Sequence, residues 1–169
     1  MDAVKLATTG LRVAYESLEQ VMGDVTPEQA FWMPPGVANP IGALYLHTLY
    51  DTDAVIQRMF QSKPPLWETG GWAQKIGTDV DMDLTAEWAR SVRFDLDAAR
   101  EYAKAVYVAA DYYVCSLGEK DFDVIIPSGT SDQTTLGHLL QSYIIWHIDV
   151  HCGEISALKG IQGLKGYPF

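Results

Sequence analysis

Apolar residues recur at intervals of three and four near the start of the chain, which is the spacing of one helix face. The stripe in residues 3 to 22 consists of Leu11, Ala14, Leu18 and Val21, and Gly23 follows it. Thr26-Pro27-Glu28-Gln29 then combines a capping residue, a proline at the first helical position and acidic support. The pattern predicts a long helix over about 3–22 and a short helical turn before Met33.

A second helical stretch opens at Asn39-Pro40, which repeats this start signal, and it predicts a helix to about Gln61. One face of this helix carries Ile41, Leu44, Thr48, Asp51, Val55 and Met59, with His47 at its edge. Residues 62–83 are rich in proline and glycine and include Trp67 and Trp72. They predict a long connection held by aromatic anchors.

The second half of the chain predicts two more helices. From near Thr85 to Gly118, apolar or small residues follow each other at three and four, which indicates one continuous helix. Residues 121–130 favour a short extended segment for which no partner strand is evident. Thr134 or Thr135 then caps a last helix that runs to about Lys159 and ends at Gly160.

Four helices of about 20 to 30 residues, each with one apolar stripe, predict an all-α fold, namely a four-helix bundle. Two of the connections are long, so a crossover along the bundle is expected in place of simple up-and-down topology. The length of 169 residues and the apolar fraction of 48% suit one domain over residues 1–169.

The charge balance narrows the choice of partners. A net charge of −10 with no basic cluster argues against nucleic acid and against an anionic membrane surface, and leaves a small-molecule substrate. The start of the chain lacks the features of a secretory leader, which predicts a cytoplasmic protein. Cys115 and Cys152 fall in helical segments without a disulfide framework, so both are expected to be reduced.

His147 and His151 carry the most specific chemical signal. On a helix, residues four apart project the same way, one turn apart. The predicted stripe of the last helix also contains Leu136, Leu140, Tyr143 and Leu158, so the pair is expected to face the core. Two imidazoles are too few for a stable metal site, and histidines hydrogen-bonded in the core or exposed at its edge explain the pair equally well.

His47 is the best candidate for a third ligand, because it lies near the apolar face of another long helix. Asp51, one turn later, could be a fourth ligand or could orient an imidazole, although a surface carboxylate is the alternative. Glu154 and Tyr143 share the histidine stripe and are weak candidates for proton transfer or substrate contact. His138 is excluded, because it lies about 180° around the helix from His147.

Three motifs together resemble the DinB-like (DinB/YfiT) superfamily of small four-helix metalloproteins. These are Asn39-Pro-Ile-Gly-Ala-Leu-Tyr-Leu-His47, Thr135-Leu-Gly-His-Leu-Leu140 and His147-Ile-Asp-Val-His151-Cys-Gly-Glu-Ile155. The resemblance implies that His47, His147 and His151 bind a metal, commonly nickel or zinc. It also implies an enzyme related to transferases that use low-molecular-weight thiols, or to suspected hydrolases. Arginine is frequent in the family at the position of Cys152, so an anion-binding role is not expected there.

The leading hypothesis is therefore a metal-dependent enzyme with an open coordination position, most simply a thiol-dependent S-transferase acting on small electrophiles. Three neutral imidazoles leave a divalent ion its full charge, which suits holding a thiol as its thiolate or acidifying a bound water. The alternatives are a metal-dependent hydrolase and a non-catalytic metal-binding bundle whose shell Asp51 completes. A homodimer formed through a helical face is expected in either case.

Overall fold

The computed structural model describes residues 2–127 and 134–167 and is almost entirely helical. The long elements are α1 (Ala3–Met22), α3 (Ile41–Ala54) continued by the π-helix η1 (Val55–Phe60), α7 (Leu96–Cys115), and α8 (Leu136–Leu139) continued by the π-helix η3 (Leu140–Ile145) and α9 (Trp146–Ile161). The short ones are α2 (Pro27–Ala30), α4 (Leu66–Thr69), α5 (Trp72–Ile76), α6 (Ala86–Ser91), the 3₁₀-helix η2 (Glu119–Asp123) and the strands β1 (Ile125–Ile126) and β2 (Thr134–Thr135). The predicted all-α class is confirmed.

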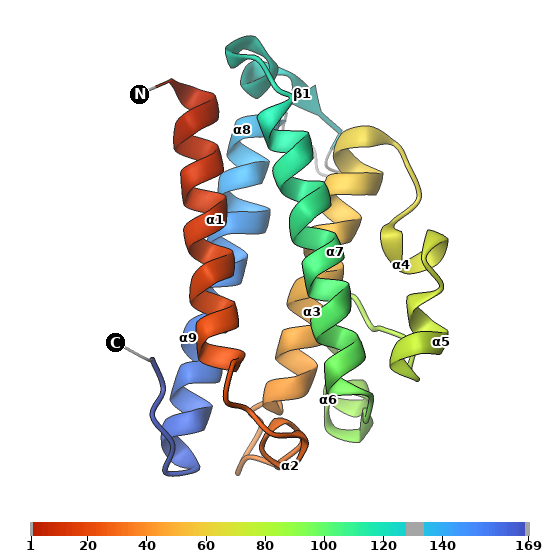
Figure 1. The fold of residues 1–169 in the computed structure, drawn as a ribbon, viewed down its shortest axis with the longest axis vertical. Coiled ribbons are helices and arrows are strands. Elements are labelled where there is room, and N and C mark those ends of the chain that lie inside the picture. Colours follow the sequence, from red (N-terminus) through yellow and green to blue (C-terminus); the bar gives the residue numbers. More distant parts are fainter. Residues whose placement is uncertain (1, 128–133, 168–169) are drawn as a thin grey trace.

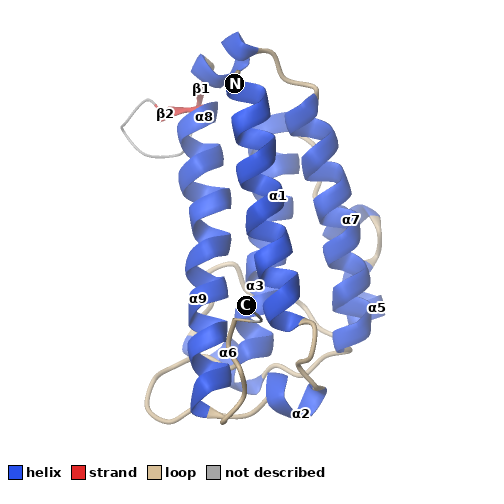
Figure 2. Ribbon diagram, turned by 60° about the vertical axis from the view of Figure 1, so that its left-hand side comes forward, coloured by secondary structure: helices blue, strands red, loops and turns tan. Residues whose placement is uncertain are grey.

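Four helical rods lie side by side and enclose one core (Figures 1 and 2). Helix α1 packs against α7 and α9, and α3 packs against the same two helices. Helices α3 and α7 run in the same direction, so the chain between them returns along the side of the bundle through α4 and α5 (Figure 1). This is the long crossover that the sequence predicts. Among the described residues, no helix has the length and apolar character needed to cross a bilayer.

Side-chain caps set several helix starts where the sequence places them. The carboxylate of Asp2 accepts the Lys5 amide at 2.7 Å, and Thr26 forms a reciprocal capping box with Gln29. The hydroxyl of Thr135 accepts the His138 amide at 3.2 Å at the start of α8. These caps satisfy amides that have no partner within the first helical turn.

The predicted third helix is wrong as a continuous element, because residues 92–95 separate α6 from α7. The backbone turns extended at Val92, and the Asp95 carboxylate then caps α7 by accepting the amides of Asp97 and Ala98. The Asp95 amide donates to the Ile76 carbonyl at 2.9 Å, which ties the break to α5. Val92 and Leu96 are buried on the two sides of the break, so the apolar periodicity continues through it.

A π-helical turn changes the phase of the last helix. Each such turn holds more residues than an α-turn, so the residues after it rotate around the axis relative to a regular helix. Ile144 and Ile148 are fully buried, whereas the side chain of Tyr143 is 50% exposed. The prediction that Tyr143 lies on the buried stripe is therefore wrong, and the stripe runs through its neighbour Ile144.

The extended segment expected at residues 121–130 has a partner strand, contrary to the prediction. Ile125 and Ile126 pair antiparallel with Thr135 and Thr134, directly before α8. The sequence could not predict this pairing, because strands of two residues are too short to show an alternating pattern of apolar and polar residues. The end of the predicted segment, residues 128–130, lies outside the described residues.

Asp53 fixes the long connection onto the bundle. This side chain is 1% exposed, and its carboxylate accepts the amides of Leu66 and Trp67 at 2.9 and 2.8 Å and the hydroxyl of Tyr102 at 2.7 Å. The rings of Trp67 and Trp72 both lie 5.3 Å from that of Tyr102, measured between centroids. The predicted aromatic anchors are confirmed, and a buried carboxylate on α3 orients the backbone between them.

Candidate metal site

Three of the four histidines come together inside the bundle, where α3 packs against α9. His47 comes from α3, and His147 and His151 come from successive turns of α9. Each offers one ring nitrogen, and these three nitrogens all lie within 4.8 Å of one another. His47 and His151 are buried and the side chain of His147 is 19% exposed. The cluster could hold a metal ion.

The geometry of the pair on α9 suits a shared ligand. The Nε2 atoms of His147 and His151 are 2.9 Å apart. Two nitrogens that each bind one ion at about 2.0–2.1 Å lie about 3 Å apart or slightly more. The ring of His47 lies 5.2 and 5.3 Å from the other two rings, measured between centroids, and is nearly perpendicular to them. All three imidazoles therefore face one small volume.

Glu154 determines which nitrogen of His151 is available. Its Oε2 lies 2.6 Å from His151 Nδ1. An ionised carboxylate only accepts hydrogen bonds, so Nδ1 carries the proton and Nε2 presents its lone pair to the cluster. The Glu154 side chain is 51% exposed, so it links the buried imidazole to the surface.

The outer nitrogens of the rings differ in their surroundings. The Nδ1 atom of His147 is buried and has no hydrogen-bond partner among the described residues, whereas the backbone of Asp81 acts on the ring of His47. A hydrogen bond between His147 and His151 would protonate His147 at Nε2 and still leave its Nδ1 without a donor. Buried polar atoms without partners are rare and costly. An ion bound at the Nε2 atoms would leave this Nδ1 unpaired as well, so the fit to a divalent ion rests on the convergence of three ring nitrogens within 4.8 Å.

Asp51 faces the same volume from α3. Its Oδ2 lies 3.6 Å from His47 Nε2 and 3.7 Å from His147 Nε2. Its Oδ1 is buried and has no hydrogen-bond partner within residues 2–127 and 134–167. Asp51 is thus a group of the site and not a surface carboxylate.

Burial dominates the electrostatics of the cluster. It lowers the pKa of His47 to about 4 and that of His147 to about 3, and the nearby charge of His151 acts in the same direction on both. Burial, followed by repulsion from Asp83, raises the pKa of Asp51 to about 7. His47 and His147 are therefore neutral at physiological pH, which is the form that binds a metal.

The structure separates the sequence candidates. His47, His147, His151, Asp51 and Glu154 meet at one place, while Tyr143 is half-exposed and belongs to another face of its helix. His138, which the sequence excludes from the site, is exposed, and so is Asp149.

The position of the acidic segment around Asp81 and Asp83 near the site was not predicted from the sequence. Its charges act on His47 and Asp51 from the long connection. The spacing of three aspartates at positions 79, 81 and 83 was the only available signal.

A cavity of about 370 Å³ lies between the start of α3 and the end of α9, and it is lined by none of the three histidines. Asn39, Leu44 and Leu158 line it together with Glu154, whose carboxylate contacts His151. This volume falls in the range of small-molecule sites, about 300–1,000 Å³. A ligand in this cavity would therefore meet the carboxylate that orients His151.

Comparisons with known proteins bear on the family and the fold of this chain. A family model described as the DinB superfamily matches residues 11–155, which include all three histidines. A solved structure, described as a conserved protein of locus from Enterococcus faecalis, is similar with a TM-score of 0.84 at 22% sequence identity. The alignment covers 96% of this chain and 99% of that one, and at this identity it supports the fold alone. No curated protein matches significantly.

Proposed function

This chain belongs to the DinB superfamily, and we propose on that premise that it is an enzyme whose metal ion is held by His47, His147 and His151. The convergence of three ring nitrogens within 4.8 Å carries the proposal. Nickel and zinc are the ions proposed, because imidazole nitrogen suits both. When bound, such an ion would lower the pKa of a thiol or of water.

The proposed reaction is attack of a low-molecular-weight thiolate on a small electrophile, which forms a carbon–sulfur bond and breaks the bond to the leaving group, such as the halide of monobromobimane. Three neutral ligands leave the site with a net positive charge when it is loaded, which favours a thiolate over a thiol. Glu154 holds His151 with its Nε2 lone pair directed inward, through the 2.6 Å contact to Nδ1. Asp51 is the proposed acceptor for the thiol proton, because its buried Oδ1 has no other partner among the described residues.

A thiol screen tests the reaction. Purified protein loaded with nickel or zinc is assayed with bacillithiol, mycothiol, glutathione and cysteine, using monobromobimane or chlorodinitrobenzene as the electrophile. We expect turnover with at least one thiol, loss of turnover in His147→Ala, and normal turnover in the exposed-histidine control His138→Ala. Equal rates in His147→Ala and the unchanged protein would contradict the proposal. Ester or amide hydrolysis without thiol turnover would assign the site to the hydrolase alternative.

A closed, non-catalytic site is the second candidate, and the position of Asp51 favours it. Structural zinc sites have four protein ligands, and Asp51 Oδ2 lies 3.6 and 3.7 Å from two of the histidine nitrogens. Metal affinity of Asp51→Asn separates the two functions. A large loss of affinity supports a fourth ligand, while retained affinity with lost turnover supports the enzyme. The proposed homodimer is tested by sedimentation analysis of the same samples.

A further inference from the structure

A groove on the far side of the bundle is unrelated to the histidine cluster. It has a volume of about 600 Å³ and is lined only by residues of α1 and α7, whereas the histidines come from α3 and α9. Tyr15, Glu16 and Glu19 line it from α1, and Tyr107 and Tyr112 from α7. The groove therefore combines aromatic rings with carboxylates.

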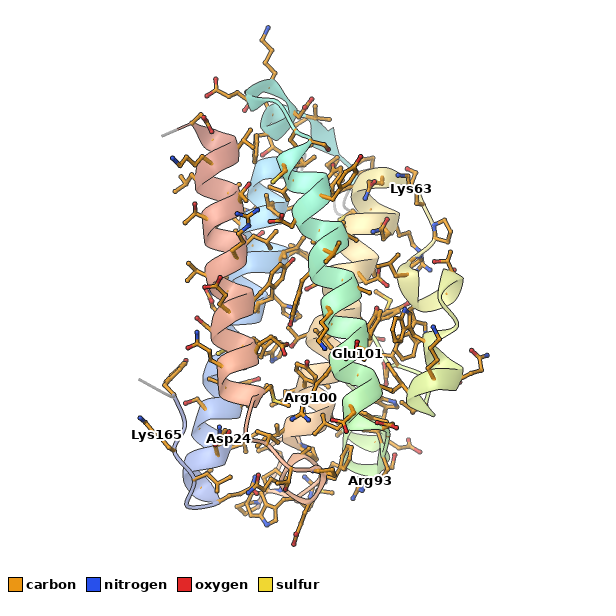
Figure 3. All side chains as sticks on the ribbon, viewed as in Figure 1. Asp24, Lys63, Arg93, Arg100, Glu101 and Lys165 are labelled. Atoms are coloured by element: carbon orange, nitrogen blue, oxygen red, sulfur yellow. The ribbon has the colours of Figure 1, made fainter. Side chains whose placement is uncertain are left out.

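Glu19 is the central acidic group of this groove. Its Oε1 accepts the hydroxyl of Tyr107 at 2.7 Å and that of Tyr45 at 2.9 Å, which fixes the carboxylate in place. It forms no ion pair within the described part of the chain. Arg100 on α7 lies nearby, but it points to the end of α1 (Figure 3) and donates to the carbonyls of Met22 and Val25.

The groove as a whole is negative. Its one cationic side chain, Arg12, is already neutralised, because its guanidinium donates to both carboxylate oxygens of Asp111 at 2.6 and 2.8 Å. One arginine against the three carboxylates Glu16, Glu19 and Asp111 gives a formal charge of −2. The net charge of the lining rests on the two glutamates, and Arg100 and Lys104 of α7 act on Glu19 from outside the groove.

The aromatic walls supply a surface for the body of a ligand. The rings of Tyr15 and Tyr107 stack with centroids 4.0 Å apart. Tyr112 is 79% exposed and its neighbour one turn earlier, Val108, is 71% exposed. The hydroxyl of Tyr15 is buried and has no hydrogen-bond partner in the part of the chain that the structure describes. A donor seated against Tyr15 would give this oxygen a partner.

We propose that the α1–α7 groove binds a small organic cation, an ammonium group on an aromatic or alkyl body. Ammonium groups bind to aromatic faces and pair with carboxylates, so both the tyrosine rings and the glutamates of the groove could contact such a ligand. An anion would be repelled by the formal charge of −2. A neutral apolar ligand would displace water from Glu19 without supplying a hydrogen bond in its place, which is unfavourable. This site goes beyond the proposed metal chemistry and does not depend on it.

Three probes that share a phenylethyl group and differ in their charged or neutral head group test the charge preference: phenethylammonium, 2-phenylethanol and 3-phenylpropanoate. Each is titrated into ¹⁵N-labelled protein at neutral pH, and chemical-shift changes are mapped onto the helices. We expect saturable shifts on α1 and α7 with the cation alone. Equal shifts with all three probes, no saturable shifts, or shifts confined to α3 and α9 would each overturn the proposal. The metal-site variant His147→Ala should bind the cation as the unchanged protein does.

Two variants test the residues. Glu19→Gln keeps the shape of the side chain and should weaken the dissociation constant about tenfold. Tyr112→Ala removes an exposed ring and should weaken it about two- to fivefold. Tyr143→Ala, an exposed tyrosine outside the groove, is the matched control and should change nothing. Unchanged affinity in both groove variants contradicts the site. A dimer that dissociates in Tyr112→Ala, without a cation-dependent shift, identifies the groove as a protein interface and also contradicts it.

Discussion

Replacing Glu154 by glutamine tests how the site orients its ligands. The carboxylate accepts the Nδ1 proton of His151 at 2.6 Å, which leaves Nε2 as the metal-binding atom. Glutamine keeps the shape but replaces a charged acceptor by a neutral one, so the imidazole becomes less basic and less firmly held.

The expected size of this effect follows from the exposure of Glu154. Loss of a group that orients a metal ligand costs about 10- to 100-fold in affinity. The Glu154 side chain is 51% exposed, so water partly screens the contact and the lower end applies. We expect about a tenfold weaker dissociation constant for zinc, or about 1.4 kcal/mol.

Competition against a chromophoric chelator measures this constant. Asp149→Asn is the matched control, because it removes an exposed carboxylate from the same helix without touching the histidines. Its affinity should equal that of the unchanged protein. If Glu154→Gln and Asp149→Asn bind zinc equally well, Glu154 does not orient His151 and the assignment of its Nε2 as a ligand loses its basis.

Three further predictions concern stability. Asp53→Ala leaves the buried Trp67 amide and Tyr102 hydroxyl without their acceptor. It should therefore lower the free energy of unfolding, measured by urea denaturation, by about 3 kcal/mol. The exposed-residue control Asp149→Ala should show no such loss. Burial raises the pKa of Glu19, so its contribution to stability is present below the unfolded pKa near 4.5 and is lost as the pH rises through the folded value. Thermal melts of Glu19→Gln should show a smaller decline over this range, because Asp51 and Asp53 still contribute to it. Zinc at 100 times its dissociation constant should raise the free energy of unfolding by about 2.7 kcal/mol, an increase absent from His147→Ala.

The sequence predicts the parts of the fold that local chemistry determines. Thr26 and Thr135 are caps in both the prediction and the structure, because a hydroxyl before a helix satisfies amides of the first turn wherever the helix packs. The histidine cluster was predictable for a similar reason. Spacing of four places His147 and His151 together, and His47 follows from its place near the apolar face of a second long helix.

Features that depend on tertiary contacts were not predictable. The break before α7 depends on a bond between Asp95 and Ile76, and it leaves the apolar spacing intact. Because η3 is a π-helix, Ile144 and not Tyr143 lies on the buried face of the last helix. A prediction that assumes a regular α-helical period cannot find this shift. Asp53 and Asp51 are both aspartates, two positions apart. Asp53 is distinguished only by its hydrogen bonds to the backbone of Leu66 and Trp67 in the folded connection, whereas Asp51 faces the histidines.

Metal content measures the central claim most directly. Protein purified without a histidine tag is analysed by mass spectrometry of the elements, beside a His147→Ala/His151→Ala double variant and a His138→Ala control. The account predicts about one nickel or zinc ion per chain in the unchanged protein and in His138→Ala, and a loss of nearly all metal in the double variant. Equal metal content in the unchanged protein and the double variant would contradict it.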